Sequence, residues 1–190
     1  MFRIILLSFY VVIILCCPSH ALENPSYPIE SVDNKTLIIE SAYNYDVRLY
    51  KQPLSVDFIE KINVDFSSPE KTLLSILSGM KNKDISWVLD CYDSESKLEL
   101  ESIISSQQSS QALIDKWNEI YTGSTIYLLR WIDTEKMIII EYSVKKEDGT
   151  EKKNNLNFRK IDNFWKATNI YSDYPVSNYL DEDRVVLHGE

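Results

Sequence analysis

The sequence predicts an α+β fold, with helices first along the main part of the chain and an antiparallel sheet after them. A capped helical start stands at Ser68-Pro69-Glu70, and apolar residues recur at helical spacing from there to Tyr121. After Thr122-Gly123-Ser124 the period changes from 3.6 to two. The later strands are joined by short connections, which allow only antiparallel neighbours. We therefore expect helices packed on one face of an antiparallel meander.

The first helix is predicted from its start signals. Ser68 can cap free amide groups, Pro69 suits the first helical position, and Glu70 lies at the positive end of the helix dipole. An apolar stripe follows at spacings of three and four, made of Leu73, Leu74, Ile76, Leu77 and Met80. The helix should end at Lys81-Asn82-Lys83.

Further helices follow this break. Asp84 can cap a second helix, and Cys91 on its apolar side is expected to be buried. A third helical stretch starts near Ser94 to Lys97, and the Ser/Gln-rich segment 105–111 interrupts it before helical spacing resumes.

Four strands are predicted after residue 123, with Gly123 and Gly149 in turns. They are Thr125–Ile132, Lys136–Lys146, Lys152–Ile161 and Phe164–Ile170. In the second of them Ile138, Tyr142 and Val144 give one mostly apolar face. We expect this face to lie on the helices.

Residues 22–66 are expected to form an N-terminal arm or an edge hairpin. Two short strands, Thr36–Ala42 and Asp46–Tyr50, flank a break at Asn44-Tyr45, and Pro53 should end the second. Asn34 begins a glycosylation sequon, whose use the sequence leaves open. The acidic tail, 173–190, is expected either to be mobile or to add a last short strand.

Residues 1–21 read as a signal peptide. Arg3 precedes an apolar run of 14 residues from Ile4 to Cys17, and small residues precede an expected cleavage near Ala21. A membrane span needs about 20 apolar residues, so we expect export without stable membrane insertion. Lipid anchoring at Cys16 or Cys17 is disfavoured, because a leucine precedes Cys16 where a lipoprotein has a small residue.

Charge and composition exclude several function classes. Removing residues 1–21 takes the 20 Lys+Arg to 19 against 29 Asp+Glu, a formal charge of −10, which argues against a nucleic-acid partner. The only histidines are His20 and His188, so a histidine-based zinc site or a Ser-His-Asp triad is not expected. Gly-rich phosphate loops are also missing. We expect no metal and no cofactor.

Two segments resemble NTF2-like domains of the cystatin-like α+β class. Residues 68–97, SPEKTLLSILSGMKNKDISWVLDCYDSESK, resemble the opening helix pair of that superfamily, and Phe158 to Lys166 is similar to its closing hairpin. The resemblance covers about residues 67–170. It implies a curved four-stranded meander wrapped around the helices into a cone, with a pocket at the open end. The expected divisions are 1–21, 22–66, 67–172 and 173–190.

The resemblance also suggests where a site could lie. Enzymes of the ketosteroid isomerase type in this superfamily use a carboxylate base with a tyrosine or a protonated acid. The weak catalytic candidates here are Asp90 and Asp93, and the candidate ligand-binding residues are Tyr92, Tyr127, Trp131 and Tyr142, with Glu141 on the same strands. The competing interpretation makes these aromatics core residues and these acids helix caps or solvent-facing groups. No catalytic residue is carried over.

Two functions from different classes follow. The favoured hypothesis is an exported, non-enzymatic binding module for a protein or a small apolar ligand, and homodimerisation through the sheet stays open. The alternative is a cofactor-free isomerase, dehydratase or hydrolase that uses a pocket carboxylate and a tyrosine. A further alternative, an immunity or inhibitor protein, is consistent with the acidity. An acid that points into an apolar pocket beside a tyrosine would favour the enzyme.

Overall fold

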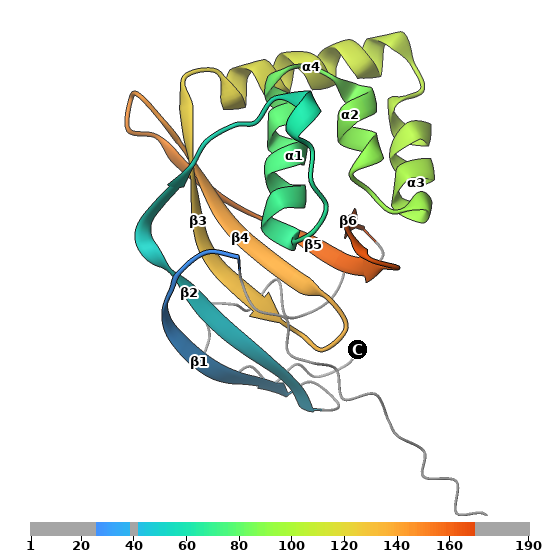
Figure 1. The fold of residues 1–190 in the computed structure, drawn as a ribbon. Coiled ribbons are helices and arrows are strands. Elements are labelled where there is room, and N and C mark those ends of the chain that lie inside the picture. Colours follow the sequence, from blue (N-terminus) through green and yellow to red (C-terminus); the bar gives the residue numbers. More distant parts are fainter. Residues whose placement is uncertain (1–25, 39–41, 170–190) are drawn as a thin grey trace, which may run out of the picture.

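A computed structural model describes residues 26–38 and 42–169 of the 190-residue chain. The expected signal peptide, Cys16, Cys17 and the acidic tail lie outside the described residues. The described chain is α+β, with helices covering one side of a curved antiparallel sheet (Figure 1). In the described ranges, no helix combines the length and hydrophobicity that a membrane crossing requires.

Six strands form the sheet, and each pairs with its neighbours in sequence order. They are β1 (Ile29–Ile38), β2 (Ala42–Val56), β3 (Ser124–Asp133), β4 (Ile138–Lys146), β5 (Glu151–Ile161) and β6 (Phe164–Thr168). The last four correspond to the predicted meander. The hairpin of β1 and β2 extends it, because β2 pairs with β3 (Figure 1).

The N-terminal strands differ from the expectation in three ways. The expected strand Thr36–Ala42 is not a single strand, because β1 ends at Ile38 and β2 begins at Ala42. The expected break at Asn44-Tyr45 lies inside β2, where Asn44 pairs with Thr36 of β1. Pro53 does not end β2, which runs to Val56. Pro53 falls where the register with β3 shifts between Leu49 and Leu54, and such an irregularity tolerates a residue without an amide proton.

The helical layer lies between β2 and β3 in the sequence. It consists of the short 3₁₀ helix η1 (Lys61–Asn63) and the α-helices α1 (Pro69–Lys81), α2 (Ile85–Asp90), α3 (Ser94–Ile104) and α4 (Gln107–Tyr121). The predicted caps are confirmed: Ser68 Oγ accepts from Lys71 N at 3.3 Å, and Asp84 Oδ1 accepts from Trp87 N at 2.9 Å. The Ser/Gln-rich interruption is shorter than expected, because Ser106 caps α4 directly.

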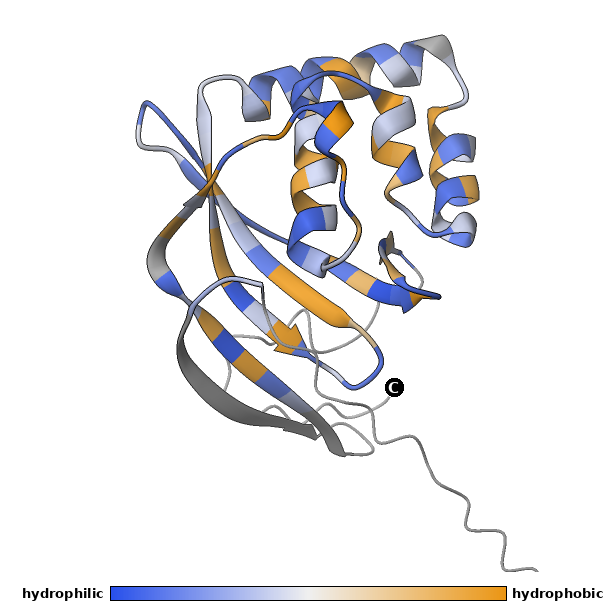
Figure 2. Cartoon of the chain, viewed as in Figure 1, coloured by the Kyte–Doolittle hydropathy of each residue, from blue (hydrophilic) through white to orange (hydrophobic). Residues whose placement is uncertain are grey.

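The main core lies between the helices and the sheet, where the apolar segments of both layers face each other (Figure 2). Tyr50, Trp131 and Phe158 are fully buried from the sheet side. Gly79 allows α1 to lie against α2, since a Cβ there would be 2.9 Å from Cγ2 of Val88. The burial predicted for Cys91 is confirmed, and its Sγ lies 3.3 Å from the Trp87 carbonyl oxygen.

Strand β4 is buried on both faces, whereas the sequence predicted one. Ile138, Tyr142 and Val144 pack in the core with the helices, as expected. Ser143, on the opposite face, is also fully buried. Glu141 is tolerated there because the Arg130 guanidinium pairs with its carboxylate through both Nε and Nη2, the latter 2.9 Å from Oε1.

Candidate functional site

The four α-helices surround an apolar cavity of about 120 Å³. Its walls come from every α-helix of the layer. The main contributors are Met80, Val88, Tyr92, Leu100, Leu113 and Trp117. The cavity therefore lies within the helical layer, whereas the NTF2-like resemblance led us to expect a pocket at the open end of a cone.

The spacing of the lining residues explains why the helices present them together. Leu113 and Trp117 on α4 are four residues apart, as are Leu100 and Ile104 on α3. Residues four apart lie on one helical face. The sequence carries this spacing, but the same pattern describes an ordinary filled core, so it could not reveal a cavity.

Tyr92 brings the one hydroxyl group to the cavity lining and belongs to a buried group of three tyrosines. The hydroxyls of Tyr121 and Tyr142 hydrogen-bond to each other, and Tyr92 and Tyr121 interact electrostatically. Burial raises the pKa of all three phenols above the usual value. At neutral pH these hydroxyls remain protonated, and they can serve as hydrogen-bond donors.

Asp90 does not point into the cavity. Its side chain is 58% exposed, and Oδ1 accepts from Lys97 Nζ at 2.7 Å. It is therefore a surface ion-pair partner.

Asp93 is buried but has a structural role. Its Oδ1 caps α3 by accepting from Ser96 N at 2.8 Å, and Oδ2 lies 3.0 Å from Arg159 Nε. Burial alone would raise the pKa of Asp93, but hydrogen bonds from Thr168 and Ser96 and the charge of Arg159 lower it overall. This carboxylate is ionised at neutral pH and holds β5 and β6 against α3.

The other candidate residues are divided between the two faces of the sheet. Tyr142 and Trp131 belong to the core with the helices, and the Arg48 guanidinium lies 4.8 Å from the centre of a Trp131 ring. Tyr127 pairs with Ser143 on the face away from the helices. A register shift between Leu128 and Arg130 causes this division, because it places Leu128 and Trp131 on the same face. Tyr92 alone among the candidates lines the cavity.

Glu70 and Tyr50 form a buried carboxyl–tyrosine pair that the sequence pattern did not predict. Glu70 is fully buried, and its Oε1 accepts from Tyr50 Oη at 2.9 Å and from Ser26 N at 2.8 Å. A glutamate in the first turn of a helix is ordinarily explained by the helix dipole, so its type and position gave no sign of burial. Tyr50 lies in a different element, and only tertiary structure brings the two together.

Among the described residues, no group of three or more His, Cys, Asp and Glu side chains is arranged to hold a metal ion. Comparisons with protein-family models, curated proteins and solved structures gave no match.

Proposed function

We propose that this protein is a non-enzymatic module that binds a small apolar ligand in the cavity between α1, α2, α3 and α4. The observation that carries the proposal is the chemistry of the cavity wall, whose side chains are hydrophobic and carry only two hydrogen-bonding groups, the phenol of Tyr92 and the indole N–H of Trp117. An enclosed apolar cavity of about 150 Å³ can bind benzene, and the hollow between these helices is somewhat smaller and partly open to solvent. A volume of about 120 Å³ suits a single ring or a short alkyl chain, with Tyr92 available to donate one hydrogen bond.

The positions of the acids support binding over catalysis. The enzyme alternative needs a carboxyl group beside a tyrosine at a pocket. Asp90 is exposed in an ion pair, and Asp93 is bound to Ser96 and Arg159. Glu70 does contact a tyrosine, but it lies ten residues before Met80 on α1, about 15 Å along the helix axis from the cavity.

The wider setting of this module is also a proposal. The NTF2-like resemblance supports membership of a superfamily whose domains often bind ligands, and residues 1–21 support export. We give a small ligand precedence over a protein partner, because a hollow of about 120 Å³ would take up little more than one side chain of a partner.

Benzene is a suitable first probe, used on protein purified from cells that express the whole sequence. Methyl resonances of Leu113 and Val88 should shift saturably in NMR spectra as benzene is added, since both side chains line the cavity. Leu113→Phe should fill the space and abolish the shift at Val88. Leu98→Phe is the matched control, because Leu98 is 67% exposed on α3.

Two results would contradict the proposal. One is the lack of any saturable shift in the parent protein. The other is an equal response in Leu113→Phe and the parent, with both proteins folded. Native mass spectrometry of the same preparation would then identify any apolar molecule carried from the cell.

A further inference from the structure

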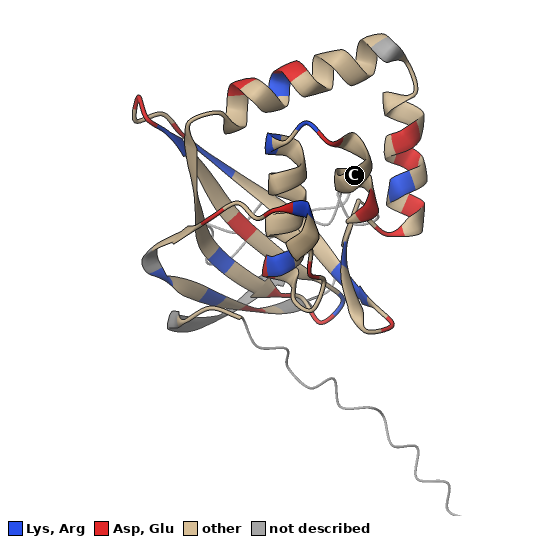
Figure 3. Ribbon diagram, turned by 45° about the horizontal axis from the view of Figure 1, so that its top comes forward, with Lys and Arg blue, Asp and Glu red and all other residues tan. Residues whose placement is uncertain are grey.

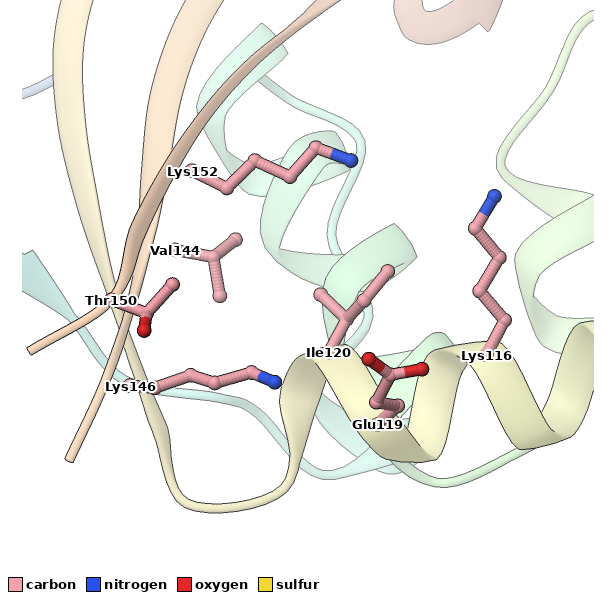
Figure 4. Close-up of a pocket in the computed structure, with 7 residues that line it drawn as sticks. All are labelled: Lys116, Glu119, Ile120, Val144, Lys146, Thr150 and Lys152. Atoms are coloured by element: carbon pink, nitrogen blue, oxygen red, sulfur yellow. The ribbon is translucent and has the colours of Figure 1, made fainter. Parts of the chain in front are cut away.

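A second hollow lies between α4 and the hairpin formed by β4 and β5, with a volume of about 280 Å³ (Figure 4). Ile120 provides half-buried apolar surface in this groove, the nearly buried Val144 lies at its base, and Lys116, Lys146 and Lys152 extend around it. The lysines come from both sides: one belongs to the helix and two to the hairpin. We call this hollow the lysine groove.

The side chains of the lysine groove lie together because of their spacing along the two strands and the helix that form its walls. Val144 and Lys146 are two residues apart on β4, so they lie on the same face of the sheet. Lys152 of β5 is the register partner of Val144 and shares that face. On α4, Lys116 and Ile120 are four apart and project together. The cations are therefore held over apolar surface by regular secondary structure.

Few of the acids that the structure describes lie beside the three lysines of the groove. None of its three lysines forms an ion pair with any residue that the structure describes, and Glu119 is the one carboxyl group that lines the groove. The nearby turn contains Asp148, whose Oδ1 accepts from Thr150 N at 2.8 Å; this hydrogen bond and, to a smaller extent, the charge of Lys146 lower the pKa of the Asp148 carboxyl. Figure 3 shows the basic positions on both hairpin strands behind an acidic tip.

This arrangement is unusual in a chain whose formal net charge is −9. Ordinary solubility would be served by spreading the lysines among the many acids. Three ammonium groups and one carboxyl group, that of Glu119 on the same helix as Lys116, line the hollow, which leaves an excess of positive charge among its lining residues. Such an excess in a concave site attracts anions and raises their local concentration.

We propose that the lysine groove binds a small amphiphilic anion, a carboxylate or phosphate group attached to a short apolar body. The anionic group interacts with the ammonium groups, and the apolar body covers Ile120 and the alkyl stems of the lysines above the buried Val144. Inorganic phosphate alone would leave that apolar surface in water. A neutral hydrocarbon would leave the ammonium groups unpaired. The proposal is independent of the helical cavity, which presents no cationic side chain.

Octanoate tests the proposal because it combines an anionic group with an apolar chain. Two controls each carry one of these parts: 1-octanol has the apolar chain and inorganic phosphate has the negative charge. In NMR titrations of protein purified from cells that express the whole sequence, octanoate should shift the methyl groups of Ile120 and Val144 saturably. The affinity should fall as salt is added, because exposed charges are screened. Octyl phosphate in a parallel titration shows whether carboxylate or phosphate is preferred.

Substitution of single lysines tests whether octanoate binds in the lysine groove. Lys152→Gln and Lys146→Gln should each weaken octanoate binding by about two- to fivefold, the range expected for an exposed charge pair. Lys153→Gln is the matched control. Lys153 is the register partner of Ser143 and lies on the other face of the sheet, so its loss should leave the affinity unchanged.

Four outcomes would overturn the proposal. They are the lack of a saturable shift with octanoate, binding of octanol as tight as that of octanoate, binding of phosphate as tight as that of octanoate, and equal losses in the Lys152→Gln and Lys153→Gln proteins. Octanoate shifts confined to Leu113 and Val88 would also overturn it, because they place the ligand in the helical cavity. The benzene titration reports on the cavity separately, so the two proposals fail independently.

Discussion

Replacement of Tyr50 by phenylalanine tests the hydrogen bond that joins β2 to the start of α1. Tyr50 and Glu70 are both fully buried, and the Tyr50 hydroxyl donates to Glu70 Oε1 at 2.9 Å. The substitution removes the donor and no carbon atom, so the packing hardly changes. Leaving a buried polar group without its partner costs about 1–3 kcal/mol. The backbone amide of Ser26 remains as a donor to Glu70, so we expect a loss near the middle of that range, about 2 kcal/mol.

Urea denaturation followed by circular dichroism measures this loss. Tyr127→Phe is the control, because Tyr127 is only half-buried on β3. Its free energy of unfolding should stay within about 0.5 kcal/mol of the parent value. Glu70→Gln completes a double-mutant cycle with Tyr50→Phe, and the coupling energy should lie within about 0.5–3 kcal/mol. If Tyr50→Phe matches the control at an unchanged m-value, the assigned bond does not stabilise the fold and the reasoning is refuted.

Three further predictions concern helix ends and titration. Ser68→Ala should lower the free energy of unfolding by about 1 kcal/mol in the same urea assay through loss of the α1 cap, and no change would contradict the cap. Burial raises the pKa of the Cys91 thiol to about 12, so a thiol reagent at pH 8 should label it only after unfolding; rapid labelling of the native protein would refute that burial. The pKa of Asp93 is lowered on folding, so its stabilising contribution is present above the unfolded value of about 3.9 and is lost as pH falls through the folded value. Acid denaturation of Asp93→Asn should therefore be less steep than that of the parent below about pH 4, and identical slopes would contradict the assignment.

Helix starts and turns were predictable because their causes are local. The cap at Ser68 and the cap at Asp84 each depend on a side chain and an amide three residues later. The four predicted strands after residue 123 follow from a period of two and from short turns. Such signals are complete within a few residues of sequence, so no tertiary contact is needed to read them.

The candidate site was harder to predict because tertiary contacts decide it. Strict alternation would place Leu128 and Trp131 on opposite faces of the sheet. The register shift between Leu128 and Arg130 puts them on the same face, and no residue in the sequence indicates that shift. The role of Asp93 depends on Arg159 from β5, which lies far along the chain. The cavity is a small packing defect among apolar residues that also predict a filled core. Its presence depends on shapes that periodicity does not specify.

The order of strands in the sheet has a consequence for how the chain folds. Neighbouring strands are joined by short turns everywhere except between β2 and β3, where η1 and all four α-helices intervene. The entropic cost of closing a loop rises with its length, and non-local pairings form slowly. We therefore expect the pairing of β2 with β3 to be the slow step of sheet assembly. Until β2 meets β3, the β1–β2 hairpin and the meander are separate units, each with an unpaired edge.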